Sequence, residues 1–414
     1  MLYRPIMKDV EAAATRIRTL FPPTPFEHNT FLSQRHSANV FLKREDLTPV
    51  RSYKIRGAFN KLSTISLKPR IATCSAGNHA QGVAYSCAIL GLQADIFMPR
   101  STTQQKIQKV MGFGGENIRL FLEGDTFDEA YERSMRYSEK ERIECVHPFD
   151  DPKIIEGQAT VGMELVEQSQ EKQVALDFLF VPVGGGGLSA GVSWYMKQKS
   201  PATKIIGVEP KGAASMMEAL RVGQPVRLPK IDPFVDGAAV RCVGYLNFPL
   251  CKAGLDSMIA IDEGHVCSKI LQMYNESGFI LEPAGVLSLC ALDSMQDDIR
   301  GKTVGCVLSG GNADVFRMPE IMERSLIYEG RKHYFQIEFP QRAGALKEFI
   351  LKVLGPGDDI FYFRYTKIIN KETGPVILGI ETPTRDDAIS LIDRMTQSDC
   401  VFTKLSHSVG MADM

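Results

Sequence analysis

Short apolar runs alternate with amphipathic stretches from about residue 39 to residue 310. Runs such as NVFLKRE (39–45) and ALDFLFVPVG (175–184) predict strands, because they are rich in β-branched and aromatic residues. Stretches such as HAQGVAYSCAILG (79–91) and GHVCSKILQMYNES (264–277) carry apolar residues at helical spacing. Repeated strand–helix units predict an α/β fold with largely parallel sheets between helices, and ligands at the C-terminal ends of the strands.

The pattern changes after about residue 325. Three apolar strands and two amphipathic helices follow in the order βαββα, namely HYFQIEFP (333–340), RAGALKEFILKVLG (342–355), DIFYFRYTKII (359–369), GPVILGIETP (374–383) and TRDDAISLIDRMTQS (384–398). This order predicts a small open α+β domain of roughly 80 residues. The sequence therefore predicts two regions, residues 1–325 and 326–414, with the boundary within SLIYEGRKH (325–333).

Composition limits the compartment and the partners. The 414 residues carry 48 Lys plus Arg against 49 Asp plus Glu, a balance that argues against a general nucleic-acid binder or a polybasic membrane surface. The nine cysteines form no C-x-x-C pair and several lie in apolar runs, which favours a reducing compartment. The sequence shows no secretory signal and no run of roughly 18 apolar residues, so we expect a cytoplasmic protein without a membrane span.

A lysine opens one of the predicted helices. In RSYKIRGAFN (51–60), Lys54 follows the strand 39–45, and Ser52 is a candidate helix cap. The helix dipole and the arginines at 51 and 56 are expected to lower the pKa of Lys54, and lysines of lowered pKa form Schiff bases. Taken alone, however, a lysine at such a place is more often a solvated surface charge.

Two turns between a strand and a helix carry candidate anion sites. CSAGNHAQG (74–82) presents backbone N–H groups and the Asn78 amide, which suits a carboxylate, although a capped helix explains the turn equally well. VPVGGGGLSAG (181–191) can enclose a phosphate. It also fits G-x-G-x-x-A, with Glu209 at the end of the next strand, so a nicotinamide or flavin enzyme competes with a compact monophosphate.

Two further polar residues stand at predicted strand ends. Ser309 in VLSGGN (307–312) is flanked by glycines that would let a flat ligand approach. Glu282 in FILEPAG (279–285) precedes another helix, where a structural role as a helix N-terminal carboxylate is also reasonable.

Together these motifs resemble one enzyme family. KREDLTPVRSYKIRGAFNKL, SAGNHAQGVA, PVGGGGLSAG, LEPAG and SGGN are similar to the motifs of fold-type II pyridoxal-phosphate enzymes, most of all the threonine dehydratases, over about residues 5–320. FPQRAGALKEFI resembles the ACT-like regulatory domain of the biosynthetic form, in a single copy. The resemblance implies a catalytic domain of residues 1–325 with two parallel-sheet α/β subdomains, the smaller one (about 53–152) inserted in the larger, and an ACT-like domain of residues 326–414.

The resemblance also implies roles for particular residues. Lys54 would bind pyridoxal 5'-phosphate covalently and carry the α-proton. The loop Gly184, Gly185, Gly186, Gly187 and Leu188 would hold its phosphate, Asn78 its ring hydroxyl and Ser309 its pyridine nitrogen, with Asn312 completing that last motif. Ser75, Gly77 and His79 would hold the substrate carboxylate. Several relatives bind a cation at E-P-x-x-A-x-D, but here Ser215 follows Glu209 and Ala213, so no metal is expected.

The implied reaction is deamination of L-threonine to 2-oxobutanoate and ammonia, the first committed step of isoleucine biosynthesis. Isoleucine is the expected effector of the C-terminal domain, with valine as a second candidate, and the expected assembly is a homodimer or homotetramer. A serine dehydratase or serine racemase of the same fold is the alternative, since one methyl group discriminates weakly. A nicotinamide-dependent oxidoreductase leaves Lys54 and SGGN unexplained, and an amino-acid sensor without activity leaves the complete set of cofactor contacts unexplained.

Overall fold

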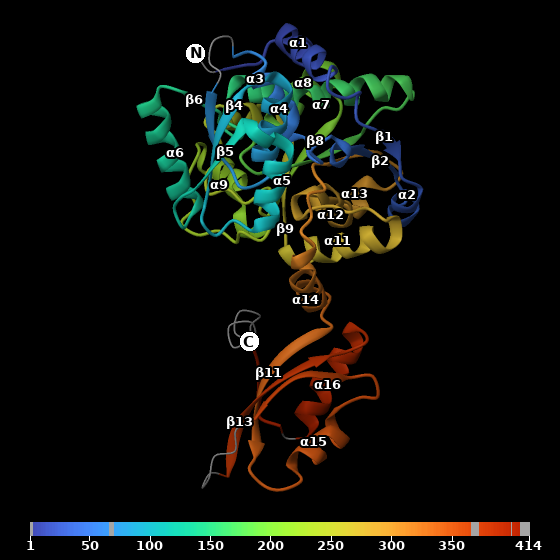
Figure 1. The fold of residues 1–414 in the computed structure, drawn as a ribbon. Coiled ribbons are helices and arrows are strands. Elements are labelled where there is room, and N and C mark those ends of the chain that lie inside the picture. The colour runs from blue at the N-terminus through green and yellow to red at the C-terminus, as the bar shows by residue number, and fades with distance from the viewer. Residues whose placement is uncertain (1–2, 66–69, 366–371, 399, 406–414) are drawn as a thin grey trace. The chain divides into compact units, whose positions relative to one another are not determined.

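The chain forms two units, Met1–Asp314 and Val315–Met414, in a computed structural model that describes residues 3–65, 70–365, 372–398 and 400–405 (Figure 1). Across these residues no helix is both long enough and apolar enough to cross a bilayer. The predicted α/β fold with a separate α+β domain is confirmed. The predicted boundary at 325/326 stays a prediction.

The first unit contains a six-stranded sheet in the order β1–β2–β10–β7–β8–β9. Strand β1 is antiparallel to β2, and the other neighbours pair in parallel. The strands are β1 (Phe26–His28), β2 (Asn39–Arg44), β7 (Phe178–Pro182), β8 (Lys204–Pro210), β9 (Ser257–Ile261) and β10 (Thr303–Leu308). Every residue of β7 is buried, as expected for a parallel strand covered on both faces.

Helices cover this sheet. They are α1 (Met7–Ile17), α2 (Thr30–His36), α7 (Pro152–Glu171), α8 (Gly187–Lys199), α9 (Ser215–Val222), α10 (Asn247–Gly254), α11 (Glu263–Ser277), α12 (Leu287–Ser294) and α13 (Gln296–Ile299). One core joins α7 and α8 to the sheet through Leu165, Val192 and Val181. Helix α12 is buried along Leu287–Leu292 and packs on β7, β8 and β10. The sequence patterns did not predict α1, β1, α2 or α7.

A second, all-parallel sheet in the order β5–β4–β3–β6 lies in the same unit. Its strands are β3 (Arg70–Cys74), β4 (Gln93–Met98), β5 (Ile118–Leu122) and β6 (Glu144–Cys145), and its helices are α3 (Lys54–Leu62), α4 (Asn78–Leu90), α5 (Gln104–Gly114) and α6 (Phe127–Glu141). Phe97, Phe121 and Tyr137 stack where α6 meets β4 and β5. These elements all fall between β2 and β7 of the large sheet along the chain.

The second unit has an antiparallel sheet in the order β12–β13–β11–β14. Its elements are α14 (Met318–Tyr328), β11 (Lys332–Pro340), α15 (Ala345–Val353), β12 (Asp359–Tyr365), β13 (Thr373–Glu381), α16 (Arg385–Gln397) and β14 (Phe402–Lys404). Phe335, Phe349 and Leu391 share one buried core. The predicted βαββα order is present, with α14 and β14 added. The predicted strand DIFYFRYTKII continues past residue 365 into positions outside the described residues.

Short 3₁₀ helices complete the fold: η1 (Glu45–Leu47), η2 (Gly115–Asn117), η3 (Lys211–Ala213), η4 (Pro283–Val286) and η5 (Val315–Arg317). Of these, η1 and η4 adjoin the candidate active site described next.

Candidate active site

Lys54 is the first residue of α3 and lies at the C-terminal edge of the large sheet. The loop before it is held by a bridge between Ser52 and Gly310 and by a bond from the Tyr53 N–H to the Ser309 carbonyl, 3.1 Å. The Lys54 Nζ donates to the Pro148 carbonyl at 2.9 Å. The prediction that Ser52 caps the helix was wrong: Tyr53 is the N-cap residue and no side chain caps the helix start.

Burial holds the pKa of Lys54 at about 8, and the nearby Glu282 carboxylate opposes this shift. A lysine in this range keeps a substantial neutral fraction near neutral pH, which a nucleophile or base requires. The prediction that Arg51 and Arg56 lower this pKa was wrong. Burial and Glu282 account for the shift without either guanidinium: Arg56 pairs with two carboxylates, and Arg51 donates to the Ile280 carbonyl at 3.4 Å.

Arg56 belongs to a fully buried ion network that sequence reasoning missed. Its guanidinium pairs with Glu45 at 2.7 Å and with Glu164 of α7 at 2.7 Å. Lys43 adds a second cation, 2.6 Å from Glu164. Breaking a buried pair leaves an unpaired charge and costs about 3–5 kcal/mol, so this network anchors the helix that carries Lys54. The sequence signal is the run of three charges, Lys43, Arg44 and Glu45, that ends the apolar stretch NVFLKRE.

The glycine loop connects β7 to α8, which begins at Gly187. The backbone of Gly186 has φ 91°, in the region that favours glycine. A Cβ at Gly185 would lie 2.5 Å from the Phe149 ring, and one at Gly184 would lie 2.9 Å from Ala238. Side chains are therefore excluded from this loop, which leaves backbone N–H groups at a helix start for an anion.

Phe149 connects the loop to the lysine, because the centroid of its ring lies 5.9 Å from Lys54 Nζ. Leu188 is buried in the first turn of α8 and packs in the core between α7 and α8. The structure thus brings Lys54 and the predicted phosphate loop to the same aromatic side chain. This arrangement suits a flat phosphorylated ring that is bound at both ends.

The turn 75–79 forms the start of α4. The Ser75 Oγ accepts from the Gly77 N–H at 3.2 Å, and Asn78 is the first helical residue. A Cβ at Gly77 would meet nothing within 4 Å, so the space above the turn is open. His79 is buried, and burial with the charge of Lys54 lowers its pKa to about 3, so its imidazole is neutral. Open space at a helix N-terminus suits a carboxylate.

Two residues from the large sheet meet this turn. The Asn78 Nδ2 donates to Glu282 Oε1 at 2.7 Å, and the Asn312 Nδ2 donates to Asn78 Oδ1 at 2.8 Å. Ser309 directly follows β10, is buried, and donates from Oγ to the Ala284 carbonyl at 3.1 Å. The structure therefore places Lys54, Asn78, Ser309 and Glu282 at one edge, where the two sheets meet.

Ser215 is the first residue of α9, and the carboxylate of Glu209, from β8, lies at the start of that helix. Glu209 is buried and accepts from the backbone N–H groups of Met216 and Met217 at 3.0 and 2.7 Å, and burial raises its pKa to about 7. The Ser215 Oγ has no hydrogen-bond partner among the described residues. Among the residues that the structure describes, no group of three or more His, Cys, Asp or Glu side chains could hold a metal ion. Glu209 therefore acts as a cap of α9 in this structure.

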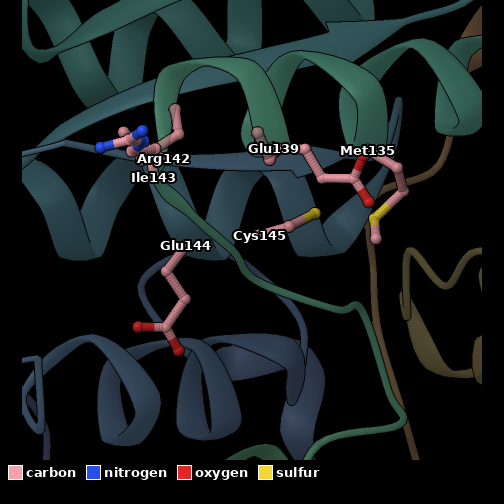
Figure 2. A pocket seen from close by; sticks show the side chains of 7 residues that line it. Met135, Glu139, Arg142, Ile143, Glu144 and Cys145 are labelled. Carbon is pink, nitrogen blue, oxygen red and sulfur yellow. The ribbon is translucent and has the colours of Figure 1, made fainter.

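A surface hollow of about 590 Å³ lies where α6 ends and β6 begins (Figure 2). Its walls are Met135, Ser138, Glu139, Arg142, Ile143, Glu144 and Cys145. None of the predicted site residues lines it. This hollow is therefore separate from the candidate active site around Lys54.

Two family descriptions match the chain. "Pyridoxal-phosphate dependent enzyme" matches residues 17–310, and "C-terminal regulatory domain of Threonine dehydratase" matches residues 323–413. The chain is 47% identical over 411 residues to the L-threonine dehydratase biosynthetic IlvA of Halalkalibacterium halodurans, covering 99% of this chain and 98% of that protein. It is 49% identical to the protein of the same name from Staphylococcus aureus strain MSSA476, covering 95% and 94%.

A solved structure, the processed form of threonine deaminase isoform 2 from Solanum lycopersicum, superimposes with a TM-score of 0.70 at 37% identity. The match covers 78% of this chain and 96% of that chain.

Proposed function

The chain belongs to the family of pyridoxal-phosphate-dependent enzymes and carries the C-terminal regulatory domain of threonine dehydratases, and on that premise we propose that it deaminates L-threonine to 2-oxobutanoate and ammonia. The observation that carries the proposal is the position of Lys54. Its amine is held at a pKa of about 8 beside a glycine loop at a helix start and a turn with open space. Pyridoxal phosphate fits these residues. Its aldehyde would react with the Lys54 amine, its phosphate would accept from the backbone N–H groups of the glycine loop, and its ring hydroxyl would bond to the Asn78 amide.

Each residue then has a definite role. Lys54 holds the cofactor and moves the α-proton of the substrate, and the N–H groups of Gly185–Leu188 bind the phosphate. When bound, the cofactor supplies the conjugated ring that accepts the electron pair left by that proton. The turn of Ser75, Gly77 and His79 orients the substrate carboxylate. Loss of the β-hydroxyl eliminates one water and loss of the amine takes one water up again, so each threonine yields one 2-oxobutanoate and one ammonia.

We expect Lys54→Ala to abolish turnover and the adduct that borohydride traps, because the variant lacks the amine that binds the cofactor and moves the proton. Keto-acid release from threonine and from serine measures the turnover, and the ratio of the two rates decides between threonine and serine as the substrate. Lys61→Ala is the matched control, since Lys61 lies in the same helix but pairs with Glu144 and Asp151. Retained activity in the Lys54 variant would contradict the proposal.

We also propose isoleucine as the effector of the second unit, with valine as a second candidate. A hollow of about 310 Å³ in that unit is lined by Phe339, Pro340, Arg342, Gly344, Ala345, Leu346, Lys347, Phe363 and Tyr365. Aromatic walls suit a branched apolar side chain, and the basic side chains with the start of α15 suit a carboxylate. These features support an effector that is an amino acid with an uncharged side chain.

The assembly and the location complete the proposal. In the second unit Leu351, Ile389 and Val401 are 72%, 53% and 69% exposed, which supports pairing between copies of the chain. We propose a homodimer or homotetramer in the cytoplasm, with a catalytic domain of residues 1–325 and a regulatory domain of residues 326–414. Sedimentation of the purified protein measures the assembly.

A further inference from the structure

Glu282 occupies a place that depends on the absence of a side chain at Gly310. A Cβ at Gly310 would lie 2.4 Å from Glu282 Oε1, and Gly237 lies on another side of the same carboxyl group, where a Cβ would be in contact with Oε1 at 3.4 Å. The backbone N–H of Glu282 bonds to the Gly310 carbonyl at 3.3 Å, and only 6% of the residue is exposed. A carboxyl group that is fixed in this way, beside Lys54, costs free energy of desolvation and needs a role.

The carboxylate is one end of a chain of amides whose donors and acceptors are fixed. Asn312 Nδ2 donates to the Val50 carbonyl at 2.8 Å, and a carbonyl oxygen can only accept, which sets the orientation of this amide. Its other N–H therefore faces Asn78 Oδ1, at 2.8 Å. The Asn78 Nδ2 is thereby turned to Glu282 Oε1, at 2.7 Å. Both ends of the Asn78 amide are thus committed.

We propose that Glu282 and Asn312 are positioning residues that hold the Asn78 amide in one orientation, so that its remaining N–H faces the ring hydroxyl of the cofactor. The inference rests on the proposed function, since it assumes that Asn78 meets the cofactor. Asn78 is the first residue of α4, a helix of the subdomain with the small sheet. Glu282 directly precedes η4 and Asn312 follows β10, both in the subdomain with the large sheet. The same bonds therefore set the orientation of the amide and join the two subdomains at the site.

The role does not require Glu282 to be charged. Burial raises its pKa to about 7, with Asp236 raising it further and the Asn78 amide, the Asn312 backbone N–H and Lys106 opposing. The protonated acid keeps a carbonyl oxygen that accepts from Asn78, so the orientation is held in either form. What the role requires is an acceptor oxygen at this place.

The experiment compares two substitutions at this residue. Glu282→Met removes every acceptor at similar volume, whereas Glu282→Gln keeps one. We expect the methionine variant to bind pyridoxal phosphate about tenfold more weakly, the effect of roughly one hydrogen bond of 1.4 kcal/mol, and to shift the absorbance maximum of the bound cofactor. The glutamine variant should recover part of both.

A buried carboxylate outside the chain of amides is the matched control. Glu156 is 2% exposed and pairs with Lys153 at 2.8 Å. Glu156→Met should lose thermal stability but keep the wild-type affinity and absorbance maximum. A Glu282→Met variant with the wild-type affinity and absorbance maximum overturns the inference, and so does a control that shifts both as much.

A second variant keeps the test open if Glu282→Met does not fold. Asn312→Ser removes the donor on the other side of Asn78 and should shift affinity and absorbance in the same direction; unchanged values would overturn the inference. Wild-type protein that binds no pyridoxal phosphate would instead contradict the proposed function.

Discussion

Burial, more than neighbouring cations, determines the chemistry of Lys54. Its Nζ lies between the Pro148 carbonyl and the rings of Tyr53 and Phe149, where the charged form is poorly solvated. Glu282 works against this shift, so the pKa of about 8 is a balance of two effects. The histidine of the neighbouring turn, His79, is neutral for the same reason.

We predict that the apoprotein forms the pyridoxal-phosphate adduct at a rate that rises as pH passes about 8, because the neutral amine is the reacting form. Borohydride trapping at several pH values, followed by peptide mass analysis at residue 54, measures this rate. A midpoint near 10.5, the ordinary value of a lysine, would contradict the prediction.

The same shift has a consequence for stability. The unfolded chain keeps the ordinary lysine pKa of 10.5 and so binds more protons than the folded chain between about pH 8 and that value. This difference makes the free energy of unfolding of the apoprotein rise with pH in that window.

At the scale of elements, α3 is held to α7 by backbone contact as well as by ions. A Cβ at Gly157 of α7 would lie 2.6 Å from the Cα of Gly57 and 2.7 Å from the Arg56 carbonyl. The helices therefore touch backbone to backbone, directly beside the Arg56 network. Lys54 stands one turn before this contact, so the packing of two helices sets the position of the reactive amine.

We predict that Gly157→Ala lowers the free energy of unfolding by roughly 1–3 kcal/mol, as overpacking does, and lowers turnover because α3 must shift. Gly112→Ala is the matched control: Gly112 is helical in α5, and a Cβ there would meet nothing within 4 Å. It should gain about 0.5–1 kcal/mol by the entropy of the unfolded chain. Urea midpoints measure both, and equal effects of the two substitutions would contradict the packing argument.

The same contacts show what the sequence could predict. Apolar periodicity predicted most strands and helices from 39 to 310, and turn composition placed Asn78, the glycine loop and Ser309 at strand ends. It could not predict that Arg56 turns inward, because an arginine near a helix start is normally solvated and its partner Glu164 lies 108 positions later. For the same reason the sequence could not predict the series of hydrogen bonds that runs from the Val50 carbonyl through Asn312 and Asn78 to Glu282. Each of these bonds joins residues more than 200 positions apart.

At the scale of the whole molecule, the two units have separate cores. Phe335, Phe349 and Leu391 belong to a core cluster formed by side chains of the second unit. Helix α14 is tied to that unit, because the Tyr334 hydroxyl donates to Glu323 at 2.6 Å and Lys332 pairs with the same carboxylate. The proposed boundary at 325/326 falls inside this helix, so a cut that preserves both units belongs before α14.

We predict that a chain ending at Asp314 keeps threonine turnover and loses inhibition by isoleucine, because the proposed effector hollow is removed with the second unit. In the full chain, Phe363→Ala should raise the isoleucine concentration for half-inhibition about tenfold, the loss of roughly 1.4 kcal/mol of apolar contact, with turnover unchanged. Tyr362→Ala, in the same strand but outside the walls of the hollow, is the control. Keto-acid release with increasing isoleucine measures all four proteins, and a shortened chain that isoleucine still inhibits would place the effector in the catalytic unit.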